Sequence, residues 1–217
     1  MSVRWYLSYS LSYRDVEELM LERGVEVDHS TIQRWVQRYS DDLEQVFRNN
    51  YKKKTGYISW RMDETYVKVK GKWCYLYRAV DKHGDTLEFM LSEKRDEDSA
   101  FKFLRKAIGS HGIPDKITID KSGTNEAALI ILNCMLFLAG QWPQRWVEDR
   151  QIKYLNNMVE QDHRNIKRRT NPMLGFKSMA SAESTIAGYE LISMLRKKQY
   201  VDAGNMTVFE QFYSLAA

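Results

Sequence analysis

Apolar positions change their spacing near residue 57, and this change divides the chain into a helical part and a part with strands. In segment 29–39, apolar side chains recur at the spacing of one helix face: Ile32, Trp35, Val36 and Tyr39. An earlier helix begins with a capping-box pattern at Ser12 and stops at Gly24. The sequence therefore predicts two short N-terminal helices joined by a tight turn.

The polar face of the second helix carries side chains that can reach base edges and phosphates in a helix-turn-helix protein. These candidates are Ser30, Thr31, Gln33, Arg34, Gln37 and Arg38. Periodicity alone favours plain helical packing over DNA recognition. The polar stretch Asp41–Gly56 resembles a linker.

Alternation of apolar and polar residues after the linker predicts a meander of three antiparallel strands. Helices and strands then alternate, which indicates an α/β protein with a mixed sheet covered on both faces. The expected strands are 57–69, 73–80, 86–91, 115–120 and 151–154, and the expected helices include 97–108, the apolar run 127–140, and two more towards the C-terminus.

Charge is concentrated in one segment, although the whole chain carries only +4. Arg150–Lys177 holds seven basic and two acidic residues. Such an excess indicates a surface that faces a polyanion, while a solvated helix face is the commoner explanation of a charge run. Cys74 and Cys134 are too isolated for a disulfide framework or a zinc site, and we expect both to be core thiols. We expect a cytoplasmic protein.

Two neighbouring carboxylates, Asp63 and Glu64, lie within the first strand-like run. Successive strand residues point to opposite faces, so the two cannot serve one site together. Charges on an edge strand would explain both of them without any site. Asp120, however, ends an apolar strand at the edge where open sheets bind ligands. A mid-strand acid and a strand-end acid can converge there.

A third carboxylate, Glu160, would share one helix face with Asn156, Arg164 and Lys167. An ion pair between Glu160 and Arg164 would explain this pattern equally well. Mg²⁺ prefers oxygen ligands and is commonly held by carboxylates together with substrate phosphate, and two such ions assist in-line phosphoryl displacement. His163 lacks partners at ligand spacing, and we interpret it as a helix-surface or DNA-facing residue.

Four collinear stretches resemble the DDE transposases of small bacterial insertion sequences, in particular the insertion-sequence-six family. They are SYRDVEELMLERGVEVDHSTIQRWVQRY, MDETYVKVKGKWCYLYRAVD, DRQIKYLNNMVEQDHRNIKRR and PMLGFKSMASAESTIAGYELISMLRK. The resemblance implies a helix-turn-helix module (1–45), a linker (46–56), an RNase H-like catalytic core (57–200) and a tail (201–217).

The same resemblance implies functional residues. Asp63, Asp120 and Glu160 match the catalytic and metal-binding acids, and Lys167 matches a basic residue that contacts DNA near the scissile phosphate. The basic neighbours Arg164, Arg168 and Arg169 are further DNA-binding candidates. The implied cofactor is Mg²⁺, with two ions expected and Mn²⁺ as a substitute. The implied partners are double-stranded DNA and further copies of the chain, in a dimer or higher assembly at the nucleoid.

Three departures from the family pattern leave alternatives open. The chain begins at MSVRWYLSYS, which we expect to shorten the first DNA-binding helix. KSGTNEAA follows Asp120 in place of a proline and an aromatic residue, and LAGQWPQRWVED lengthens the interval to Glu160. A disabled copy that only binds DNA, and an RNase H-like nuclease without strand transfer, are therefore the alternatives to an active transposase.

Overall fold

The computed structural model describes residues 1–53, 59–120, 123–140, 146–151 and 157–216. Contacts divide the chain into two compact units. The first joins Met1–Lys53 to the C-terminal part from Arg168 onward, and the second is Lys54–Lys167. The C-terminal helices thus belong with the N-terminal ones, a grouping that differs from the ranges implied by the family resemblance.

The first unit is helical. Its elements are α1 (Ser2–Ser8), α2 (Tyr13–Leu21), α3 (His29–Val46), the π-helical turn η1 (Phe47–Tyr51), α7 (Met179–Arg196) and α8 (Val208–Ser214). Ser12 and Asp15 form the expected capping box of α2, and the Asp28 side chain caps α3 by accepting hydrogen bonds from two backbone N–H groups. Helical structure continues to Tyr51, well into the stretch that resembled a linker.

Helix α7 packs along α3 through apolar and polar contacts. Gln37 donates a hydrogen bond to Ser181 Oγ over 2.8 Å, and Ser184 donates one to Asp41 over 2.6 Å. Gly188 lies where a Cβ atom would meet Leu7 at 2.6 Å and Ser40 Oγ at 2.7 Å. The glycine therefore permits a close approach of α7 to α1 and α3.

The second unit is built on a five-stranded sheet of order β3-β2-β1-β4-β5. The strands are β1 (Ser59–Val69), β2 (Lys72–Asp81), β3 (Thr86–Ser92), β4 (Lys116–Thr118) and β5 (Glu148–Arg150). The first three are antiparallel, while β4 pairs in parallel with both β1 and β5. This confirms the expected mixed sheet of an α/β protein.

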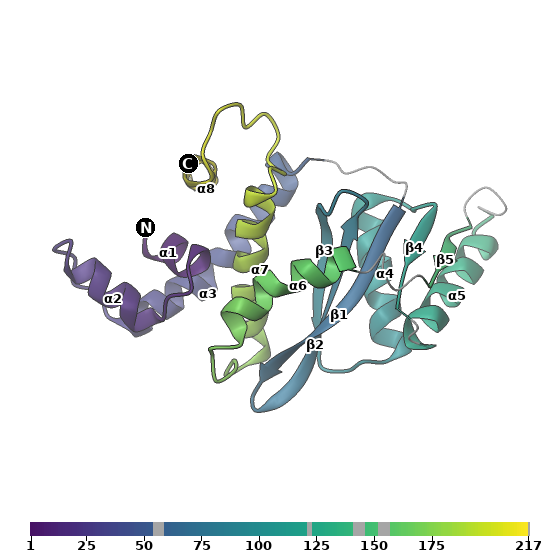
Figure 1. Ribbon diagram of the computed structural model, residues 1–217, viewed down its shortest axis with the longest axis horizontal. Coiled ribbons are helices and arrows are strands. Elements are labelled where there is room, and N and C mark those ends of the chain that lie inside the picture. Colours follow the sequence, from purple (N-terminus) through teal and green to yellow (C-terminus); the bar gives the residue numbers. More distant parts are fainter. Residues whose placement is uncertain (54–58, 121–122, 141–145, 152–156, 217) are drawn as a thin grey trace. The chain divides into compact units, whose positions relative to one another are not determined.

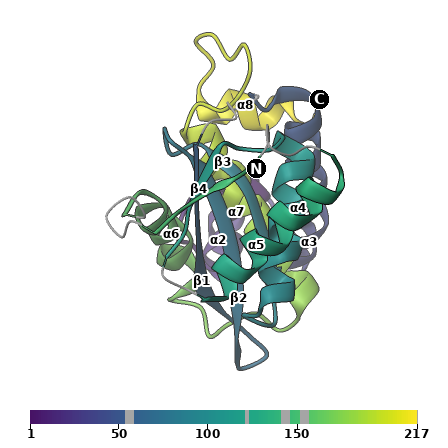
Figure 2. The ribbon, with the colours of Figure 1, turned by 90° about the vertical axis from the view of Figure 1, so that its right-hand side faces the viewer.

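Helices cover both faces of this sheet (Figures 1 and 2). Helices α4 (Glu97–His111) and α5 (Gly123–Leu138) lie on one face, and α6 (Asn157–Thr170) lies on the other. Trp60, Met62 and Tyr77 pack beneath α4 and α5 in a continuous apolar core. Burial of this core is the main favourable term that holds the layers together.

Four details differ from the sequence-based expectations. Strand β5 ends at Arg150, before the expected strand 151–154, of which residues 152–154 lie outside the described residues. Helix α5 is buried on one face only, because Ile130 and Phe137 are more than half exposed. Cys134 is exposed on that helix, so its interpretation as a core thiol was wrong, whereas Cys74 is buried as expected. The tail contains α8, which a capping box at Thr207 begins.

Within the described part of the chain, no helix is long and apolar enough to cross a membrane.

The close approach at Gly188 gives a stability prediction. Gly188→Ala inserts a methyl group against buried Leu7, and overpacking of this kind costs about 1–3 kcal/mol, so the thermal unfolding midpoint should fall. Gly109→Ala is the matched control, because Gly109 is an exposed residue of α4 with nothing within 4 Å of the added Cβ. The control should raise stability by up to about 1 kcal/mol. Equal midpoints for the two variants would contradict the packing argument.

Candidate functional site

Asp63 and Glu64 point to opposite faces of β1. In the antiparallel pairing with β2, Asp63 lies opposite Arg78 and Glu64 lies opposite Tyr77. Tyr77 belongs to the core under α4 and α5, whereas Arg78 contacts Asp162 of α6. Asp63 is therefore on the α6 face, and Glu64 is on the face covered by α4 and α5.

Asp120 follows β4, the strand that pairs in parallel with β1. The ladder pairs Ser59 with Lys116 and Arg61 with Thr118, where β4 ends, and Asp120 comes two residues later in the chain. Neighbouring strands lie about 4.8 Å apart. Asp63 lies in β1, and Asp120 follows the neighbouring strand β4; the convergence of their side chains stays a prediction.

His163 of α6 contacts Asp63, with 3.1 Å between its Nε2 and Asp63 Oδ2. The histidine side chain is only 4% exposed and the aspartate side chain 17%. The interpretation of His163 as a surface residue was therefore wrong: α6 turns it towards the sheet. Its spacing from Val159 and Ile166, both buried, was the sequence signal that could have indicated this.

A buried ion pair attaches α6 to the sheet beside this contact. Arg78 of β2 donates to Asp162 Oδ2 over 2.6 Å, and the two side chains are 0% and 7% exposed. Charge-assisted hydrogen bonds of this length are strong, particularly where water is excluded. Asp162 and His163 together fix which face of α6 lies against the sheet.

The opposite face of α6 carries the remaining predicted residues. Glu160, Arg164 and Lys167 are all exposed, while Asn156, expected on the same face, lies outside the described residues. No three acidic, histidine or cysteine side chains of the described residues are grouped closely enough to hold a metal ion. The structure therefore does not bring Asp63, Asp120 and Glu160 together as one cluster.

Asp120 and Glu64 share two polar partners. Asn125 of α5 donates from Nδ2 to Glu64 Oε2 over 3.1 Å, and the same nitrogen lies 3.3 Å from Asp120 Oδ1. Arg95 donates from Nε to Glu64 Oε1, and its Nη2 lies 3.5 Å from Asp120 Oδ2. Burial raises the pKa of Glu64, and the contacts with Asn125 and Arg95 oppose that rise.

The predicted DNA-facing residues of α3 divide into two groups. Ser30, Arg34 and Arg38 are exposed, and Thr31 and Gln33 are partly so. Hydrogen bonds from Ser30 and Thr31 lower the pKa of Asp28 to about 2, which keeps the cap of α3 ionised. Gln37 donates to Ser181 of α7 and is thus used in packing.

Arg168 is exposed, whereas its neighbour Arg169 is engaged inside the first unit. Arg169 donates to the carbonyl oxygens of Leu7 and Ser8, and its guanidinium carbon lies 4.9 Å from the centre of the Tyr189 ring. Burial, followed by the nearby charge of Arg196, lowers the pKa of Arg169 to about 10. Because its guanidinium makes these contacts, Arg169 is not available as a DNA-binding cation in this conformation.

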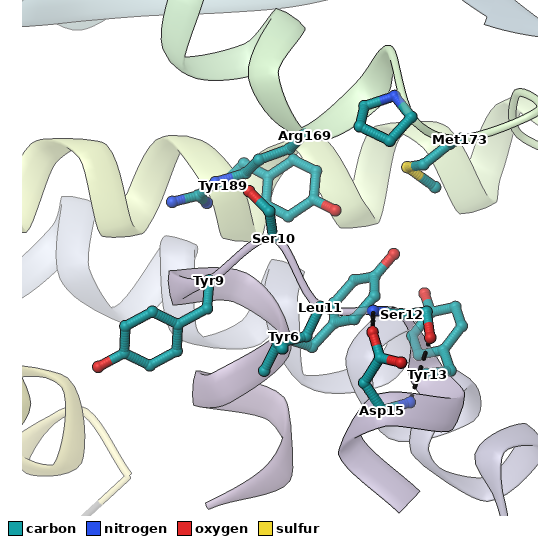
Figure 3. Close-up of a pocket in the computed structure, with 11 residues that line it drawn as sticks. Tyr6, Tyr9, Ser10, Leu11, Ser12, Tyr13, Asp15, Arg169, Met173 and Tyr189 are labelled. Atoms are coloured by element: carbon teal, nitrogen blue, oxygen red, sulfur yellow. Dashed lines mark hydrogen bonds between the residues drawn. The ribbon is translucent and has the colours of Figure 1, made fainter.

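Arg169 also lines a cavity of about 370 Å³ in this unit, together with Tyr6, Tyr13 and Tyr189 (Figure 3). The Tyr6 and Tyr13 rings stack on each other with centroids 4.1 Å apart, and Tyr6 also lies against Tyr189 at 6.1 Å. These ring contacts hold Tyr6, Tyr13 and Tyr189 together along the wall of the cavity.

The comparisons of this chain with family models and with curated proteins agree on one family. A family model described as a DDE domain matches residues 57–199. The chain is 42% identical over 197 residues to the transposase for the insertion sequence-like element IS431mec of Staphylococcus aureus, covering 91% of this chain and 83% of that protein. The same values hold for the Staphylococcus aureus transposase for insertion sequence element IS257 in transposon Tn4003.

Solved structures similar to this chain include two retroviral integrase cores. The HTLV-2 integrase catalytic core domain in complex with magnesium, in its trimeric form, is 17% identical, with a TM-score of 0.45 and coverage of 65% of this chain and 88% of that one. The catalytic core domain of BIV integrase is 16% identical, with a TM-score of 0.45 and coverage of 73% and 95%.

The ion pair between β2 and α6 gives a second prediction. Asp162→Asn removes a carboxylate that bonds the buried charge of Arg78, and breaking a buried pair in this way costs about 3–5 kcal/mol of unfolding free energy. Urea denaturation measures the loss. The double variant Arg78→Met/Asp162→Leu removes both charges and should recover most of the stability. A single variant within about 0.5 kcal/mol of the parent would show that the pair does not hold α6.

Proposed function

Because this chain belongs to the DDE-domain family of insertion-sequence transposases, we propose that its DNA transposition site is formed by Asp63, Asp120 and Glu160. The chain is a DNA transposase, a polynucleotidyl transferase, by its family. The observation that supports the proposed site is the parallel pairing of β1 with β4, because Asp63 lies in β1 and Asp120 follows β4.

The three residue types suit a divalent metal, although their side chains are not grouped closely enough to hold one among the described residues. Carboxylate oxygens at the end of a strand are hard ligands of the kind that Mg²⁺ takes together with substrate phosphate and water. Asp63 and Asp120 would hold the ions, and Glu160 would complete the set from α6, on the sheet face towards which Asp63 points. When bound, two such ions, Mg²⁺ or Mn²⁺, would activate the attacking oxygen and stabilise the leaving oxygen.

The residues of the chain have separate tasks in this proposal. His163 orients the Asp63 carboxylate through its contact with Oδ2. Lys167 and Arg164, exposed on the same helix as Glu160, hold the DNA backbone by charge. In the first step water hydrolyses one strand at each element end and frees its 3′-hydroxyl. In the second this hydroxyl attacks a phosphate of the target, and the new phosphodiester bond replaces the bond to the target strand's own 3′-oxygen, which leaves.

Helices α2 and α3 are proposed as the module that recognises the inverted repeats, with Ser30, Gln33 and Arg34 towards DNA. The first residues of a recognition helix are the ones that meet base edges. Arg38 and Arg168 are exposed and add backbone contacts. Two ends must be joined in one reaction, so we infer a dimer or larger assembly, located on DNA at the nucleoid.

Strand transfer in vitro tests the site. Asp63→Asn, Asp120→Asn and Glu160→Gln should each abolish the joining of labelled element ends to a plasmid in Mg²⁺ or Mn²⁺, because each removes a charged oxygen ligand. DNA binding by the same variants should persist. Binding without joining by the parent chain would favour the alternative of a disabled copy, and cleavage without joining would favour a nuclease. Joining by the Glu160→Gln variant would overturn the assignment of that residue.

A second test concerns α3. Arg34→Ala should weaken binding to the inverted repeat by about tenfold, because one good contact to a base contributes about 1–3 kcal/mol. Gln37→Ala is the matched control on the same helix: its amide bonds Ser181, so DNA affinity should not change. Fluorescence anisotropy with specific and scrambled duplexes measures both. An equal loss in the two variants would contradict the proposed recognition face.

A further inference from the structure

Arg95 is held in a fixed place at the edge of the sheet. It lies in the short connection between β3 and α4, directly before Asp96, which caps α4 by accepting from the Ser99 N–H over 2.9 Å. On the other side, Ser92 Oγ accepts from the Lys94 N–H over 3.2 Å. Hydrogen bonds therefore restrain the backbone on both sides of Arg95.

The Arg95 side chain reaches from this connection to two acids. Its Nε donates to Glu64, and its Nη2 lies 3.5 Å from Asp120, at the long end of the hydrogen-bond range. A guanidinium has five N–H donors, and these contacts use two of its nitrogens. The side chain is 34% exposed, so the group is anchored at one end and open to solvent at the other.

Glu64 is the anchor. Its side chain is 3% exposed, Arg95 and Asn125 occupy its two oxygens separately, and Asn125 itself is 1% exposed. A buried carboxylate with both oxygens bonded is not an open ligand. Its negative charge instead keeps a cation beside Asp120.

We propose that Arg95 binds a DNA backbone phosphate beside Asp120, and that Glu64 and Asn125 are positioning residues that aim it. This inference rests on the proposed function, because it takes Asp120 as part of the transposition site. A phosphate entering next to Asp120 brings negative charge to a place that already has two carboxylates, and an arginine offers planar paired donors suited to it. The long contact with Asp120 is the one that the phosphate replaces.

The salt dependence of DNA binding tests this inference. The probe is a labelled duplex of arbitrary sequence, bound by the full chain, because a phosphate contact does not depend on the base sequence. Arg95→Ala should lower the slope of log Kd against log salt by about 0.9, the amount expected for one phosphate contact. Arg105→Ala is the matched control, an exposed arginine of α4, and should leave the slope unchanged.

Two further variants separate binding from support of the fold. Arg95→Lys should keep the salt slope, because the charge remains, but slow strand transfer, because the planar fork is lost. Glu64→Gln should also keep the salt slope and slow strand transfer, because Arg95 keeps its charge but is no longer held in place by the Glu64 carboxylate. An unchanged slope in Arg95→Ala, or an equal fall in Arg105→Ala, overturns the inference. Joining that survives Asp120→Asn, in contrast, overturns the proposed function and leaves the slope result unaffected.

Discussion

The alternation of side chains along β1 determines which carboxylate can serve which role. Asp63 and Glu64 are adjacent in the chain, yet one meets His163 of α6 and the other meets Asn125 of α5. Two neighbours on a strand cannot share a site, so this edge of the sheet has one acidic contact on each face. Asp120 follows β4 and contacts Arg95 and Asn125, the two partners of Glu64.

The position of α6 also depends on its contacts with the sheet. A buried ion pair such as Arg78–Asp162 adds little net stability compared with apolar packing. It does, however, restrict how its two side chains, and so β2 and α6, can lie relative to each other. Asp162 and His163 are consecutive and both buried, which fixes the rotation of the helix. Glu160 and Lys167 are then left on the exposed side, where a substrate can approach them.

The spacing of apolar residues and the residue types at turns and helix caps were enough to predict most of the fold. The three-stranded meander, with Gly71 at its first turn, α4 and the capping box at Ser12 are local features, and the structure confirms them. The burial of His163 and the hydrogen bonds from Arg95 and Asn125 to Glu64 could not be predicted from such local features. Arg95 is 31 residues from Glu64 and Asn125 is 61 residues from it, so only the tertiary fold brings them together. The exposed side of α5 was missed because its apolar residues surround the helix and show no single face.

The exposed fraction of each carboxylate at this end of the sheet indicates whether it can bind a ligand or instead holds neighbouring side chains in place. Glu64, with both oxygens bonded and a side chain 3% exposed, would have to break two buried contacts before it could bind anything else. Asp120, with a side chain 40% exposed, holds its partners at 3.3 and 3.5 Å, distances that are weak enough to exchange. Asp63 lies between them in exposure, and its carboxylate contacts His163. The strand-end position of Asp120 therefore gives it freedom to bind a ligand, and the mid-strand burial of Glu64 gives the edge its rigidity.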